Sequence, residues 1–194
     1  AEARAKLKAR QGAAMVMTAG MRIVDMESGA DVPVDGETIG EILIRGNTIM
    51  KGYLKDQDNT AESLKDGWFH TGDLAVMHAQ GYAEIKDRLK DIIISGGENI
   101  SSVEIEGVLH KHPAVSLAAV VALPDEKWGE VPCAFLELLE GKSVSENEID
   151  TFCRSQLAGF KRPKKIVFGE LPKTATGKIQ KYELRALARS GKLN

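Results

Sequence analysis

Two apolar segments, VSLAAVVAL (115–123) and VPCAFLELLE (131–140), set the character of the second half of the chain. Both are short, apolar and bounded by polar residues, which predicts buried β-strands. Helical patterns flank them, SSVEIEGVLHKH (101–112) before and SENEIDTFCRSQL (145–157) after. The connections look too short and too mixed for a purely parallel sheet. We therefore expect an α+β fold with helices on one or both faces of a small sheet.

Both predicted helices begin with a capping-box pattern, Ser101 with Glu104 and Ser145 with Glu148. In this pattern the serine and the glutamate satisfy amides that the first helical turn leaves unpaired. The second helix also carries an apolar stripe at helical spacing, formed by Ile149, Phe152, Cys153 and Leu157. Further along the same half, we predict strands at DIIIS (91–95) and KIVFGEL (165–171) and a last helix at KYELRALARS (181–190).

The first 85 or so residues are predicted to be mostly β. MRIVDM (21–26) and GEILIRG (40–46) are typical of strands. LAVMHAQGYAEIKDR (74–88) predicts a hairpin that turns at Gln80 and Gly81.

Three segments of this half lack a strand pattern. Residues 1–11 predict a short polar helix or a tail, and DNTAESLKDG (58–67) predicts a short helix capped by Asn59 or Thr60. GWFHTGDL (67–74) is bounded by glycine and is expected to be irregular.

The charged segment IKDRLKD (85–91) lies between these two halves. Its composition fits a hinge between two domains, although a surface β-turn is the plainer interpretation of the composition alone. Either way, it marks the change from a mostly β region to an α+β region.

Composition narrows the classes of function. The chain has 194 residues, 43% of them hydrophobic and 28% charged, as in ordinary globular proteins. No run of 18 apolar residues exists, so we expect no membrane insertion. Cys133 and Cys153 are isolated and form no zinc or disulfide pattern, so a reducing cytoplasm is the simplest setting.

Charge is distributed unevenly along the chain. Residues 154–194 hold eleven lysines and arginines but two acidic residues. Such an excess suggests an anionic partner, which could be nucleic acid, a nucleotide or a phosphorylated cofactor, or it could serve solubility alone.

LPKTATGKIQK (171–181) ends in a Gly-Lys pair like that of a phosphate-binding loop. The match to the Walker pattern fails, because Pro172 stands where the first glycine belongs and Ile179 where Ser or Thr binds magnesium. Lys178 is therefore either a solvated turn residue or a phosphate ligand of another kind.

Four other stretches carry residues suited to ligand binding, each with a plainer interpretation beside it. Asp73 can accept hydrogen bonds from two hydroxyls or can be a turn residue, and Arg88 can be a surface ion-pair partner. Gly96 and Gly97 permit close approach of a ligand or a helix entry. In GFKRPKK, Phe160 lies among cations, as suits a stacked base with phosphates or a solvated loop.

Together these stretches resemble the C-terminal part of an adenylate-forming acyl-CoA synthetase, from the superfamily that includes luciferases and peptide-synthetase adenylation domains. The resemblance rests on GEILIRGNTIMKGYLKDQDNTAESLKDGWFHTGDLA, GYAEIKDRLKDIIISGGENISSVEIE, HPAV, PDEKWGE and LPKTATGKIQKYELR, and covers nearly all of the chain from residue 20. It implies a β-rich end of the large AMP-binding domain (1–86), a hinge (87–91) and a small mobile α+β domain (92–194).

The resemblance also implies roles for individual residues. Asp73 would bind the ribose hydroxyls, Arg88 the ribose or phosphates, and Lys178 the α-phosphate and the substrate carboxylate as the catalytic residue. Lys90 would be the pivot of domain rotation. The remaining implied ligands are for CoA: Gly96, Gly97 and Glu98 along the pantetheine tunnel, and Phe160, Arg162, Lys164 and Trp128 at the CoA nucleotide.

The cofactors implied are ATP or AMP, CoA and Mg²⁺, with the metal bound mainly by a part of the enzyme that would precede Ala1. A small carboxylate would be the substrate, and no metal ligand is expected in this chain. Ser102 departs from the resemblance, because many members have proline there. Two alternatives stay open: an adenylating enzyme that serves a carrier-protein thiol or oxidises its adenylate, and a non-catalytic basic module that binds nucleic acid.

Overall fold

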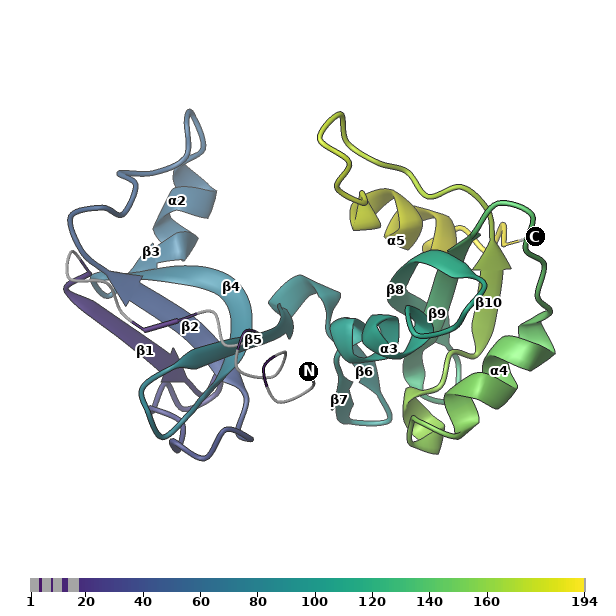
Figure 1. Ribbon diagram of the computed structural model, residues 1–194. Coiled ribbons are helices and arrows are strands. Elements are labelled where there is room, and N and C mark those ends of the chain that lie inside the picture. Colours follow the sequence, from purple (N-terminus) through teal and green to yellow (C-terminus); the bar gives the residue numbers. More distant parts are fainter. Residues whose placement is uncertain (1–3, 5–7, 9–11, 14–17, 194) are drawn as a thin grey trace. The chain divides into compact units, whose positions relative to one another are not determined.

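The computed structural model describes residues 18–193 together with Arg4, Lys8, Gly12 and Ala13. Most of the predicted helix or tail over residues 1–11 lies outside the described residues. The chain divides into two compact units, Ala1–Lys90 and Asp91–Asn194 (Figure 1). The division falls within the charged segment 85–91 that the sequence marks as a boundary.

The N-terminal unit is built on one antiparallel sheet in the order β1-β2-β4-β3, with β5 also paired to β4. Its strands are β1 (Gly20–Val24), β2 (Gly40–Arg45), β3 (Leu64–Lys65), β4 (Trp68–Met77) and β5 (Ala83–Arg88), and its helix is α2 (Gln57–Ser63). A small core of buried side chains holds it together: Ile23, Val32, Ile42, Ala75 and Ala83. The hairpin predicted over 74–88 is confirmed as β4 and β5.

Two expectations for this unit were wrong. Helix α2 is capped by Asp56, whose carboxylate accepts from the amide of Asn59, so the cap lies before both predicted positions. The segment 67–74 is not irregular, because β4 runs through it. Gly72 adopts a φ of 69° inside the strand. Near it, the register of β4 shifts in its pairing with β2 and again in its pairing with β5. The glycine that suggested a loop therefore marks a bulge within a strand.

The C-terminal unit contains a mixed sheet in the order β10-β9-β6-β7, with β8 also paired to β9. Only the β10–β9 pair is parallel among its described strand pairs. The strands are β6 (Ile93–Ser95), β7 (Glu98–Ile100), β8 (Val115–Asp125), β9 (Gly129–Leu138) and β10 (Lys165–Phe168). The helices are α3 (Ser102–Leu109), α4 (Glu146–Arg154) and α5 (Lys181–Arg189), with 3₁₀ turns η1 (Leu89–Asp91) and η2 (Gly159–Lys161).

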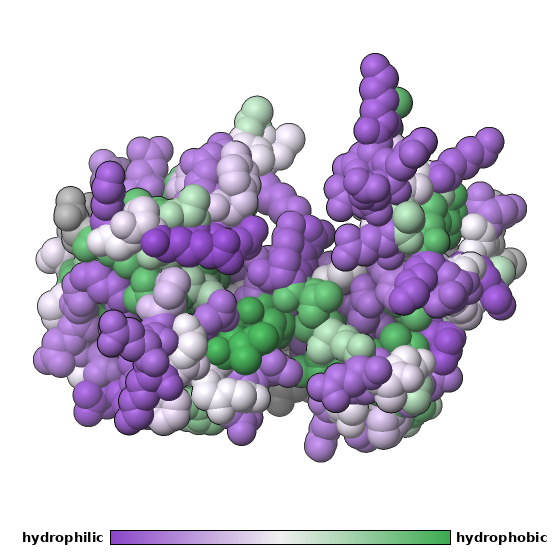
Figure 2. Space-filling view, turned by 180° about the vertical axis from the view of Figure 1, so that it is seen from behind, coloured by the Kyte–Doolittle hydropathy of each residue, from purple (hydrophilic) through white to green (hydrophobic). Residues whose placement is uncertain are grey.

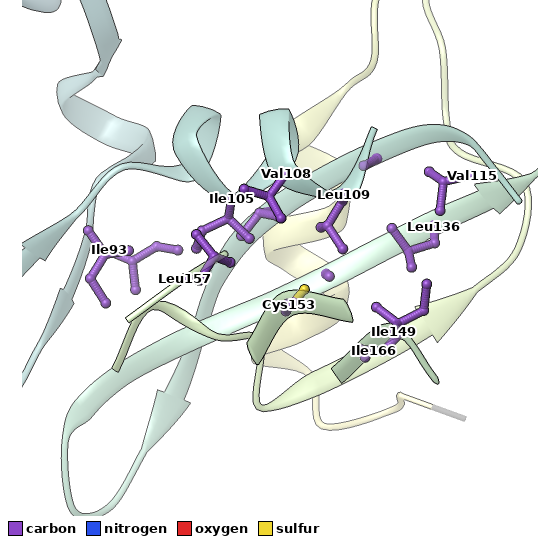
Figure 3. Packing of buried hydrophobic residues seen from close by; sticks show 14 residues of the cluster. Ile93, Ile105, Val108, Leu109, Val115, Leu136, Ile149, Cys153, Leu157 and Ile166 are labelled. Carbon is purple, nitrogen blue, oxygen red and sulfur yellow. The ribbon is translucent and has the colours of Figure 1, made fainter. Parts of the chain in front are cut away.

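Strands β8 and β9 are buried on both faces, which explains their continuous apolar sequence. On one face Val120 and Leu136 pack with α3 and α4, and Figure 3 shows the side chains that meet there. On the other face Val121 and Phe135 pack with Leu184 of α5. The expected α+β fold is confirmed, with helices on both faces of the sheet.

The capping box predicted for α4 is confirmed, and of the box predicted for α3 the serine half is present. Ser145 and Glu148 form a complete capping box, and the Ser101 hydroxyl accepts from the amide of Glu104. Outside the cores, the face of the molecule in Figure 2 is mainly hydrophilic, with apolar residues in scattered patches. Within the described part of the chain, no helix is long and apolar enough to cross a bilayer.

Candidate functional site

In the N-terminal unit, Asp73 and Arg88 are directly opposite each other on β4 and β5. The Arg88 Nε lies 3.2 Å from Asp73 Oδ1, and the side chains are 51% and 27% exposed. Asp73 is thus partly exposed and paired with a cation on the neighbouring strand. The two residues predicted to contact one nucleotide are brought together.

The bend that presents Asp73 is held by Glu41, which is buried although it is charged. One oxygen of its carboxylate accepts from the amide of Gly72 at 3.0 Å, and the other lies 2.9 Å from His70 Nδ1. The amide of Asp73 itself donates to the Thr71 hydroxyl at 3.1 Å. A buried carboxylate on β2 therefore fixes the local geometry of the strand just before Asp73.

The boundary between the units falls in the 3₁₀ turn η1, whose first two residues are exposed. Lys90, the predicted pivot, is exposed in this turn. The next residue, Asp91, forms an ion pair with Arg185 of α5, and both side chains are largely buried. The C-terminal unit is thus tied to its own last helix from its first residue onward.

Lys178 lies on a loop between β10 and α5 that projects from the C-terminal unit (Figure 1). The loop closes on itself: the amide of Gln180 donates to the Pro172 carbonyl at 2.8 Å, and that of Thr174 to the Lys178 carbonyl at 2.8 Å. Gly177 turns the chain with a φ of 83°. Lys178 is exposed, and no carboxylate among the described residues pairs with its amine.

The segment SGGENI forms a hairpin turn between β6 and β7. Gly96 and Gly97 adopt φ values of 61° and 90°, so glycine is needed for a tight turn here. The Gly96 amide donates to the Trp128 carbonyl at 2.8 Å, and a Cβ on Gly96 would lie 2.8 Å from the Trp128 ring. Trp128, which is 46% exposed, therefore covers the turn, while Glu98 is exposed.

In the cationic segment after α4, some of the side chains are exposed and others are paired with acidic residues. Phe160 is 45% exposed on η2 and Lys164 is exposed. Arg162, by contrast, is 23% exposed and its Nη1 lies 2.9 Å from Asp150 Oδ1. Arg154 pairs with the same carboxylate at 2.7 Å, and the two guanidinium groups lower the pKa of Asp150.

Most of the basic residues that gave the chain's end its charge have acidic partners within the same unit. Seven of the eleven basic residues after position 153 are in ion pairs: Arg154, Lys161, Arg162, Lys165, Lys173, Lys181 and Arg185. The local surface is thus less cationic than the sequence of this segment indicates. Among the residues described, no cluster of three or more His, Cys, Asp or Glu could hold a metal ion.

Glu41, Asp91 and Arg185 were not singled out from the sequence. Glu41 carried a signal, since it is a charged residue in the otherwise apolar strand segment GEILIRG. The Asp91–Arg185 pair carried none, because its members are far apart in sequence.

Residues 104–178 match the family model described as the AMP-binding enzyme C-terminal domain. A 2-methylpropanoate–CoA ligase of Humulus lupulus is 56% identical over 190 residues, covering 96% of this chain and 34% of that protein. A peroxisomal acetate/butyrate–CoA ligase of Arabidopsis thaliana is 52% identical over 193 residues, covering 97% of this chain and 34% of that protein.

Among solved structures, ATP-bound MatB from Rhodopseudomonas palustris superposes with a TM-score of 0.83 at 34% identity, covering 90% of this chain and 35% of that one. The chain spans about a third of the length of the curated relatives it matches. It is therefore a homologue of AMP-binding acyl-CoA ligases and corresponds to their C-terminal part.

Proposed function

We propose that the chain is the C-terminal part of an ATP-dependent ligase that converts a small carboxylate and CoA to an acyl-CoA, with release of AMP and pyrophosphate. The reaction would pass through an acyl-adenylate. The relatives named as acetate, butyrate and 2-methylpropanoate ligases support a short acyl group. The observation that carries the proposal is Lys178, exposed on a closed loop of one unit while Asp73 lies on the other.

In the first half-reaction, a carboxylate attacks the α-phosphorus of ATP and pyrophosphate leaves. Both reactants are anions, so a cation that contacts both lowers their repulsion as the transition state forms. Lys178 suits this role because its amine has no described acidic partner that would neutralise it. Asp73 would accept hydrogen bonds from the ribose hydroxyls, with Arg88 beside it to contact the ribose or a phosphate.

In the second half-reaction, the CoA thiol attacks the carbonyl carbon of the adenylate and AMP leaves. Lys178 and an arriving thiol cannot occupy the same side of that carbonyl. We propose that the C-terminal unit turns about Lys90 between the two steps and presents the turn formed by Gly96 and Gly97, with Glu98 beside it, to the pantetheine arm. Because both glycines lack a Cβ, the arm can approach the backbone closely.

The CoA nucleotide would lie near Phe160, Lys164 and Trp128, with an aromatic face for adenine and a cation for phosphate. Arg162 is partly neutralised by Asp150, so Lys164 is the stronger candidate for the phosphate contact. Mg²⁺ would be held mainly by the part of the ligase outside this chain. Two unpaired buried cysteines fit a reducing compartment such as the cytoplasm.

The test uses the full-length ligase that carries this chain. Lys178→Ala should abolish ATP–pyrophosphate exchange but spare acyl-CoA formation from supplied acyl-adenylate. Lys90→Pro should do the reverse, because it stiffens the pivot. Equal loss of both half-reactions in both variants would contradict this division of roles.

The rival functions have their own outcomes in the same assays. Transfer to a carrier-protein thiol with none to CoA would favour a carrier-dependent enzyme. Salt-dependent nucleic-acid affinity without adenylation would favour a binding module. The extensive pairing of basic residues with acidic partners counts against that module.

A further inference from the structure

The loop that carries Lys178 is held at both of its legs by a lysine–glutamate ion pair. Before the turn, Lys173 Nζ lies 2.7 Å from Glu137 Oε2. After it, Lys181 Nζ lies 2.7 Å from Glu106 Oε1. We call these two pairs the loop clamps.

The first clamp joins the loop to the central strand of the sheet. Glu137 lies on β9, and the oxygen that pairs with Lys173 also accepts from the amide of Leu171 at 3.2 Å. Leu171 is buried in the core under α5. The Lys173 amine and the Leu171 amide together lower the pKa of the Glu137 carboxyl, so this clamp is charged at neutral pH.

The second clamp joins α5 to α3 and to the edge of β8. The Glu106 oxygen that pairs with Lys181 also accepts from the Val120 amide at 2.7 Å. Lys181 Nζ further donates to the hydroxyl of Ser102, which is fully buried, at 2.8 Å. The Lys181 and Glu106 side chains are 19% and 15% exposed, so this pair is well shielded from water.

Between the clamps, backbone hydrogen bonds join the two legs. The Gln180 amide reaches the Pro172 carbonyl, and the Thr174 amide reaches the Lys178 carbonyl. The Lys178 amide donates to the Thr174 hydroxyl at 3.1 Å. The place of Lys178 is thus set by a short, bonded path from each clamp.

We propose that Lys173, Glu137, Lys181 and Glu106 are positioning residues for Lys178 in the adenylation half-reaction. This inference rests on the proposed function. The tip of the loop, residues 174–178, is exposed, while Ile179 after it packs against the core. The two partly buried ion pairs at its legs therefore help to decide how narrowly the lysine is placed. A misplacement of about 1 Å can cost about a hundredfold in rate.

The decisive experiment compares Lys173→Gln and Lys181→Gln in the full-length ligase with two matched variants. Lys173→Arg keeps the ion pair. Lys142→Gln removes an exposed lysine of the same unit that forms no ion pair with the residues that the structure describes. We expect both clamp variants to lower kcat for ATP–pyrophosphate exchange about tenfold to a hundredfold, with KM for ATP nearly unchanged. Lys173→Arg and Lys142→Gln should stay close to wild type.

A second readout separates positioning from stability. Acyl-CoA formation from supplied acyl-adenylate should be unchanged in Lys173→Gln, since Lys178 is not needed in that step. Parallel loss of both half-reactions together with a lowered Tm would overturn the proposal, as would normal exchange kinetics in both clamp variants.

Amide hydrogen exchange does not depend on activity. It therefore distinguishes failure of the loop clamps from failure of the proposed function. The Thr174, Lys178 and Gln180 amides should exchange faster in Lys173→Gln than in Lys142→Gln. Faster amide exchange in an enzyme that forms no adenylate would refute the proposed function, while the structural role of the loop clamps would still hold. Unchanged exchange would refute the clamps while the proposed function stands.

Discussion

Replacing Gly96 by alanine should disturb the turn between β6 and β7 in two separable ways. At a φ of 61° an L-residue costs about 1–2 kcal/mol relative to glycine. In addition, the new Cβ would lie 2.8 Å from Trp128 Cε3, closer than van der Waals contact allows. Such overpacking costs about 1–3 kcal/mol, so we expect a total loss of about 2–5 kcal/mol.

A double-mutant cycle with Trp128→Ala isolates the second contribution. In that background the collision is absent, and Gly96→Ala should cost only the backbone strain of about 1–2 kcal/mol. Gly97→Ala provides a control, because its Cβ would meet nothing within 4 Å although its φ is also positive.

The stabilities in the cycle are measured by urea unfolding of the chain followed by far-UV circular dichroism, because the Trp128→Ala variants lack the reporting ring. The emission of Trp128 is read separately in a Trp68→Phe background. Trp128 is then the only tryptophan, since the chain has two. Gly96→Ala should shift its native emission as the ring moves, whereas Gly97→Ala should not. A cycle with no coupling between Gly96→Ala and Trp128→Ala, together with unchanged emission, would refute the packing of this ring on the turn.

Three further outcomes are expected. Glu41→Gln should destabilise the N-terminal unit by about 1–3 kcal/mol and weaken AMP binding to the full-length ligase, because the partly buried Gly72 amide loses its charged acceptor. Urea unfolding and an AMP titration measure the two effects, and full AMP affinity would contradict the positioning role. The pKa of Glu137 in the folded state is lowered from 4.5, so the ion pair of this carboxylate should contribute its full stabilisation above pH 4.5 and lose it as the pH falls through the lowered pKa. The difference in unfolding free energy between wild type and Glu137→Gln should therefore shrink on acidification. A difference that does not change with pH would contradict this role of Glu137. Burial raises the pKa of the Cys133 and Cys153 thiols to about 12 and about 11. A thiol reagent at pH 8 should therefore label neither cysteine until urea unfolds the chain. Rapid labelling of the native chain would disprove their burial.

Local signals in the sequence predicted most of the C-terminal unit. The capping box of Ser145 and Glu148 spans one helical turn, and the strands β8 and β9 are continuous apolar runs. Such features are complete within a few residues, so no distant partner is needed to recognise them. The same holds for Lys178. The glycine before it and the short polar run around it indicated a candidate phosphate ligand.

Other features depend on residues far apart in the chain. The strand through Gly72 was missed because its irregularity is absorbed by pairing with β2 and by Glu41, 31 residues earlier. Arg162 looked like a free cation because its partner Asp150 is 12 residues away on α4.

The sequence by itself determined the α+β class and the starts of α3 and α4, since each depends on neighbours along the chain. It also predicted which residues could contact a nucleotide. Only the tertiary structure decided which basic side chains form ion pairs with acidic residues and which do not. Ion pairs such as Lys173 with Glu137 and Arg185 with Asp91 join residues 36 and 94 positions apart. No spacing rule links such residues, because their approach results from how the sheet and helices pack.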